Sequence, residues 1–150
     1  MKKTLWMLLA LLSASPAHAD DLLIEDAWVR LSPPVADSTA AYMVVRNTGS
    51  ESVKLTGVAC DVADSAGMHA MRMDGNRMVM SPLSEVGIPA NGEARFSPGG
   101  SHVMLMGLKH PLKEGEMVEI VFRLSDGENL TLSAPVRDMR AGHAQHSGMH

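Results

Sequence analysis

Apolar and polar residues alternate along most of the chain, and turn-forming residues interrupt the alternation at intervals of roughly eight to twelve positions. A period of two is typical of half-buried β-strands, because successive side chains point to opposite faces of a sheet. The pattern predicts an antiparallel β-sandwich or barrel without a long amphipathic helix. The expected strands span residues 23–31, 41–47, 52–60, 68–73, 77–81, 93–97, 102–108, 117–124 and 130–136.

Residues 1–19 have the pattern of a secretory leader. Lys2 and Lys3 precede an apolar run over residues 5–12, and the motif AHA supplies the small residues that signal peptidase recognises. The run is shorter than the roughly 20 apolar residues needed to span a bilayer. We therefore expect cleavage of a signal peptide after Ala19 and a periplasmic protein.

The mature chain has the size of one domain, expected over residues 20–138, and a mobile tail is expected over residues 139–150. The whole sequence has a formal net charge of −4, and loss of the two leader lysines makes it −6. A net negative charge argues against nucleic acid and anionic lipid as partners. We expect a monomer without a membrane span.

Cys60 is the only cysteine, so no intramolecular disulfide can form. We expect it to be a small buried apolar residue with an inert thiol. An exposed thiol that forms mixed disulfides is the alternative, and rapid labelling without denaturant would favour it.

The stretch GMHAMRMDGNRMVM, residues 67–80, holds five methionines and one histidine. Its Asp74-Gly75 pair, flanked by alternating residues, predicts a two-residue type I′ hairpin turn. With this pair at the centre of the turn, His69 is opposite Met80. A four-residue loop would instead place Met71 opposite Met80. Either register leaves the histidine and Met80 on the same face of the sheet.

A second cluster follows in the stretch SHVMLMGL. Alternation predicts that Val103 and Leu105 face the core, whereas His102, Met104 and Met106 face the other way. One histidine and two thioethers are unusual on a solvent-facing side of a strand. The two clusters together therefore favour a metal site.

Methionine packing is the main alternative to a metal site. Methionine fills irregular cores well, and aromatic residues form only 3% of this sequence. We therefore expect Met43, Met106 and Met117 to replace aromatic residues in the core. A β-sandwich interaction module with a methionine-rich core, which binds no copper, stays open as an interpretation.

The ligand types indicate which metal such a site would bind. Thioether sulfur is neutral and soft and favours Cu(I), whereas Ca²⁺ and Mg²⁺ require oxygen ligands. Structural zinc sites use thiolates and imidazoles. Two imidazoles and two thioethers therefore favour Cu(I), and a site without thiolate can pass copper to an acceptor that offers cysteine.

The same residues resemble the ligand pattern H-x10-M-x21-H-x-M of the PCuAC-type periplasmic copper(I) chaperones. His69, Met80, His102 and Met104 match all four positions and all three spacings. The resemblance covers about residues 22 to 137 and includes AWVR, RNTG and APVR. It implies a cupredoxin-like antiparallel Greek-key sandwich or barrel. It also implies delivery of Cu(I) to the copper-bearing subunit of cytochrome c oxidase or to an intermediate copper chaperone.

The tail looks like the His- and Met-containing extension of some family members, which is thought to form a second site that prefers Cu(II). A solvated tail without metal is the alternative. The candidate ligands of this second site are His143, His146, Met149 and His150. The methionines expected to support the Cu(I) site, or to offer it alternative sulfur contacts, are Met71, Met73, Met78 and Met106.

Two other function classes compete with a copper carrier. Copper storage or resistance without a dedicated acceptor uses the same ligands and stays open. A copper redox enzyme fits less well, because blue-copper sites need a Cys thiolate with two histidines and Cys60 has no histidine close behind it. Asp20, not histidine, is the expected mature N-terminus, which argues against a histidine-brace oxygenase. We therefore expect a protein that is not an enzyme.

Overall fold

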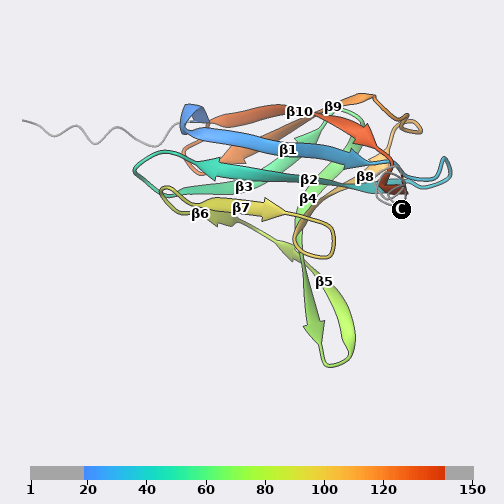
Figure 1. Cartoon of the computed structure of the whole chain (residues 1–150), viewed down its shortest axis with the longest axis horizontal. Helices are drawn as coiled ribbons and strands as arrows, with labels where there is room; N and C mark the ends of the chain where they lie inside the picture. Colours follow the sequence, from blue (N-terminus) through green and yellow to red (C-terminus); the bar gives the residue numbers. More distant parts are fainter. Residues whose placement is uncertain (1–18, 141–150) are drawn as a thin grey trace, which may run out of the picture.

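The computed structural model describes residues 19–140, where nearly all regular structure is β (Figure 1). A three-residue 3₁₀ helix, Ala19–Asp21, precedes the first strand. Within residues 19–140, no helix is long and apolar enough to cross a membrane. The strands are β1 (Leu22–Arg30), β2 (Ser38–Asn47), β3 (Val53–Cys60), β4 (Ala63–Asp74), β5 (Arg77–Leu83), β6 (Val86–Ile88), β7 (Glu93–Phe96), β8 (His102–Leu108), β9 (Met117–Leu124) and β10 (Asn129–Arg137).

The expected all-β class is confirmed, and each of the nine expected strands corresponds to a strand of the structure. Strand β4 begins five residues earlier than expected, because the small and polar residues of 63–67 give no apolar alternation. Strand β6 was not expected, since three residues are too few to establish a period. The expected signal peptide lies outside the described residues, apart from Ala19.

The strands form one hydrogen-bonded series in the order β5-β4-β8-β2-β1-β10-β9-β3-β6, and β7 pairs with β2 outside this series. Its pairs are antiparallel except β1 with β10, which is parallel. The series folds over into two layers (Figure 1). Phe96 of β7 stacks on Phe122 of β9 across the core, with ring centroids 6.1 Å apart. The core therefore lies between the layer of β2 and β8 and the layer of β9.

The buried face of β8 is the one that alternation predicts, since Val103 and Leu105 are fully buried. The prediction for methionines is correct only in part. Met43 is buried, but Met106 is half-buried and Met117 is 57% exposed on β9. Met117 alternates with the buried Val118, so it points away from the core.

One buried polar side chain joins three segments. The Asn47 side chain donates from Nδ2 to the carbonyl oxygens of Glu51, at 2.7 Å, and Ile88, at 3.2 Å. Its Oδ1 accepts a hydrogen bond from the Gly49 amide at 2.9 Å. Asn47 is fully buried, so these bonds satisfy all three groups where water does not reach. This side chain fixes the end of β2 against β6.

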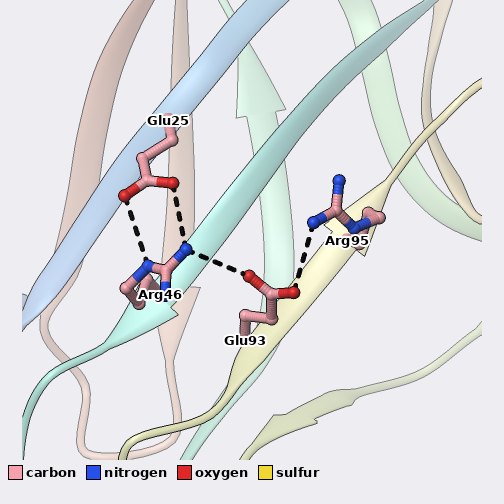
Figure 2. Close-up of polar contacts among 4 residues, drawn as sticks. All are labelled: Glu25, Arg46, Glu93 and Arg95. Atoms are coloured by element: carbon pink, nitrogen blue, oxygen red, sulfur yellow. Dashed lines mark hydrogen bonds and ion pairs between the residues drawn. The ribbon is translucent and has the colours of Figure 1, made fainter.

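A ladder of ion pairs crosses the exposed side of β1, β2 and β7 (Figure 2). The Arg46 guanidinium donates to Glu25 at 3.2 Å and to Glu93 at 3.4 Å, and Arg95 donates to Glu93 at 3.2 Å. The hydrogen bond to Glu25 is the main reason that the pKa of Arg46 is raised. Exposed pairs contribute little to stability. The main role of these ion pairs is therefore to align three neighbouring strands, β1, β2 and β7.

Candidate metal site

The methionine-rich stretch forms the β4–β5 hairpin, in a register that differs from the first expectation. Met71 is opposite Met80, and the residues at the centre of the turn are Gly75 and Asn76. The type I′ turn centred on Asp74-Gly75 is therefore wrong, and the alternative partner of Met80 is correct. Only Gly75 of the two central residues has positive φ, at 63°. Glycine at the first central position is the pattern of a type II′ turn.

Strand β8 adds a second histidine to the hairpin. His69 is paired with His102 across β4 and β8, and the two rings stack with centroids 5.9 Å apart and an interplanar angle of 18°. His102 Nε2 lies 3.1 Å from Met80 Sδ. Three strands thus bring two imidazoles and one thioether together, as the spacing predicts.

The loop before β8 determines how His102 presents its ring. His102 Nδ1 lies 3.2 Å from the Gly100 carbonyl oxygen, which can only accept a hydrogen bond. A neutral ring that donates from Nδ1 has its lone pair on Nε2, the atom that faces Met80. The loop is closed by backbone hydrogen bonds from Ser97 to Ser101 and from Gly100 to Ser97. The loop therefore holds the Gly100 carbonyl oxygen in place beside His102 Nδ1.

Met104 lies on the same face of β8 as His102. Its neighbours in register are Ala40 on β2 and Gly67 on β4. Neither neighbour has a side chain larger than a methyl group. At Gly67 the space is limited, since an added Cβ would lie only 3.2 Å from Cε1 of His69. All four residues of the predicted ligand set therefore share one face of three adjacent strands.

The donor set fits a soft cation. His69 Nδ1 is buried and has no hydrogen-bond partner, so this nitrogen would gain from a bound ion. The Nε2 lone pair of His102 and the sulfur of Met80 face each other, an arrangement that a shared cation stabilises. Within residues 19–140, no three His, Cys, Asp or Glu side chains group as a metal site. Among the described residues, methionine sulfur is the donor that completes a site around the two histidines.

The site opens into a groove of about 880 Å³ whose lining includes Met71, Met80, His102 and Met104. The lining also includes residues 30–34, Ala36 and residues 138–140. Tyr42 lines the groove and packs on Trp28, with ring centroids 4.8 Å apart. The sequence did not predict Tyr42 in the groove or its contact with Trp28, although Trp28 lies in the motif AWVR. Met80 is 44% exposed, so the site is accessible from outside.

The other candidate residues lie apart from this groove or outside the described part of the chain. Cys60, on β3, is half-buried, and burial raises the pKa of its thiol. His110 is exposed, and its Nε2 lies 3.0 Å from a Glu116 carboxylate oxygen. The four tail candidates lie outside the described residues, so the second site stays a prediction. Arg140, the last described residue, lines the groove.

Residues 22–136 match the family model described as "Putative lipoprotein LpqE-like". The chain belongs to the LpqE-like family. A relative, "Putative lipoprotein Lxx21020" of Leifsonia xyli subsp. xyli (strain CTCB07), is 34% identical over 132 residues. That match covers 87% of this chain and 78% of the relative.

Solved structures connect the LpqE-like chain with the family inferred from the ligand pattern. The copper-bound PCuAC domain from PmoF2 has a TM-score of 0.67 at 22% identity and covers 79% of this chain and 93% of that domain. Apo-DR1885 from Deinococcus radiodurans has a TM-score of 0.63 at 33% identity, with 92% and 97% covered. The CuI form of DR1885 has a TM-score of 0.58 at 38% identity, with 85% and 83% covered. The expected PCuAC-type family and cupredoxin-like fold are thereby confirmed.

Proposed function

We propose that this protein is an exported copper carrier, not an enzyme, that binds Cu(I) with His69, Met80, His102 and Met104. The approach of His102 Nε2 to Met80 Sδ, at 3.1 Å, carries the proposal. Both atoms donate electron pairs, and a soft monovalent cation suits an imidazole nitrogen and a thioether together. The relative from Deinococcus radiodurans, solved as its CuI form, supports the same choice of ion.

The carrier holds copper as cargo and releases it by ligand exchange. Met80 is 44% exposed, so an acceptor can approach the ion from the hairpin side while the histidines on paired strands still hold it. A thiolate of the acceptor forms its bond as Met80 gives up its own, and copper stays monovalent throughout. The proposed acceptor is the copper-bearing subunit of cytochrome c oxidase or an intermediate copper chaperone.

Anaerobic competition against a chromogenic Cu(I) chelator tests the ligand set. We expect the double variant H102A/M104A to lose tight binding while its unfolding by urea still shows a cooperative transition. The control is H110A/M117A, which also removes one histidine and one methionine but from exposed positions away from the groove. Unchanged Cu(I) affinity in H102A/M104A would contradict the proposal.

Cellular tests separate delivery from storage. A deletion strain grown at low copper should lose oxidase activity and regain it when copper is added. Copper sensitivity with normal oxidase activity would instead mean sequestration.

Two further measurements test export and the absence of catalysis. Cleavage after Ala19 predicts that mass spectrometry of the mature protein identifies Asp20 as its first residue. The redox alternative requires the copper-loaded protein to oxidise a reductant under oxygen, and we expect no such turnover.

A further inference from the structure

One face of the β4–β5 hairpin consists largely of thioethers. Paired residues share a face of a sheet, and residues two apart on one strand do so as well. Met73 is paired with Met78, and Met71 with Met80. These four methionines therefore share the face of His69, and they connect the hairpin turn with the imidazoles.

The charged side chains of the hairpin belong to its other face. Arg72 is paired with Val79, and Asp74 with Arg77, so all four alternate with the methionines. Between the turn and His69 the methionine face thus carries no charged group. A monovalent cation on this face meets sulfur without an adjacent guanidinium on the same side.

The hairpin geometry sets the distances between these sulfurs. In a two-residue hairpin, the pair that closes the turn exchanges hydrogen bonds, and hydrogen-bonded and non-hydrogen-bonded pairs then alternate. Asp74 and Arg77 close the turn, so both methionine pairs are non-hydrogen-bonded, the type with Cα atoms only about 4.5 Å apart. Successive pairs on one face are about 7 Å apart along the strand. Side chains as long as methionine can bridge such a step.

Core packing does not explain the two methionines nearest the turn. Met73 is 60% exposed and Met78 is 53% exposed, and the hairpin projects from the body of the molecule (Figure 1). Met117, on β9, is similarly exposed at 57%, but its partner in register is Pro135. Met117 is therefore as exposed as Met73 and Met78, but it is not opposite another methionine. Among these three residues, only Met73 and Met78 place two sulfurs opposite each other.

We propose that Met73 and Met78 form a second, weaker thioether site for Cu(I), and that the ion passes between this site and the imidazoles through Met71 and Met80. The inference rests on the proposed copper function and adds a route for the ion. At each step between methionines one copper–sulfur bond forms as another breaks. At the last step copper–nitrogen bonds to the neutral rings of His69 and His102 form as the copper–sulfur bond to Met71 breaks. Copper stays monovalent, and no proton moves between the methionines, because thioethers do not titrate.

Methyl NMR of the full chain, labelled with ¹³C at the methionine methyl groups, tests the second site by titration with Ag(I), a soft redox-inert probe. The first equivalent should shift the methyl signals of Met80 and Met104. Further silver should shift those of Met73 and Met78 but leave Met117 unchanged. If only the first pair responds, the second site is refuted and the carrier proposal stands. If the Met80 and Met104 signals never move, the carrier proposal fails.

The variant M73L/M78L separates sulfur chemistry from apolar contact, because leucine keeps the apolar surface and removes the thioether. We expect this variant to lose the second silver step, keep the first, and transfer Cu(I) to a thiol chelator more slowly than the control M117L. Transfer at the control rate would overturn the proposed route. Slow transfer that persists with the second silver step intact would also overturn it.

Discussion

Adding one methyl group at Gly67 tests how closely the site is fitted around His69. In the variant G67A the new Cβ would lie 3.2 Å from Cε1 of His69 and 3.9 Å from Cε of Met106. The first distance is shorter than ordinary contact, so the ring must move by a few tenths of an ångström. Changes to groups that orient a metal ligand cost about 10- to 100-fold in affinity. We expect a loss of about tenfold, or about 1.4 kcal/mol of binding free energy.

Stability should respond differently from affinity. Glycine inside a strand is less favourable than alanine by roughly 0.5–1 kcal/mol, which offsets the cost of moving the His69 ring, so the free energy of unfolding of G67A in urea should lie within about 1 kcal/mol of that of the wild type. The assay is anaerobic competition for Cu(I), with G87A as the matched control. Gly87 is also a strand glycine, on β6, and its added Cβ would meet nothing within 4 Å. Equal Cu(I) affinity in the two variants would refute the argument about His69.

Three further predictions concern the fold and the thiol. N47A leaves two carbonyl groups and one amide without partners and should lower the free energy of unfolding in urea by about 3 kcal/mol; a loss below about 1 kcal/mol would contradict this. F122A removes a fully buried ring and should lower the free energy of unfolding in urea by about 3–5 kcal/mol. A loss as small as that of a substitution at an exposed position would mean that the core repacks around the missing ring. Burial raises the pKa of Cys60 above 9.0, so iodoacetamide should label the native protein more slowly than the urea-unfolded chain. The stabilisation linked to the protonated Cys60 thiol is present below the pKa of the unfolded state and is lost as pH rises through the raised pKa of the folded state. Equal labelling rates of the native and unfolded protein at pH about 8 would contradict the pKa shift.

Local sequence patterns predicted most strands because each strand is half-buried and therefore alternates. They did not settle the hairpin register, since Asp74-Gly75 and Gly75-Asn76 are both good turn pairs. The pairing of His69 with His102 joins β4 to β8, which are separated in sequence by three other strands. Such a contact follows from topology, which local alternation does not specify.

Ligand spacing identified the four residues that the structure gathers on one face. The supporting residues were missed for a physical reason. Gly67 acts through the side chain that it lacks, and Gly100 acts through its backbone carbonyl oxygen. Met117 was misplaced because alternation gives two faces but does not say which of them is buried.

The hydrogen-bonded series of strands has β5 and β6 at its two ends, and both ends discourage growth. Strand β6 has only three residues. Strand β5 contains Pro82, whose backbone nitrogen carries no hydrogen to donate to an incoming strand. A second molecule would find few consecutive partners along either edge. The protein can therefore display exposed methionines on a projecting hairpin with little tendency to polymerise into fibrils.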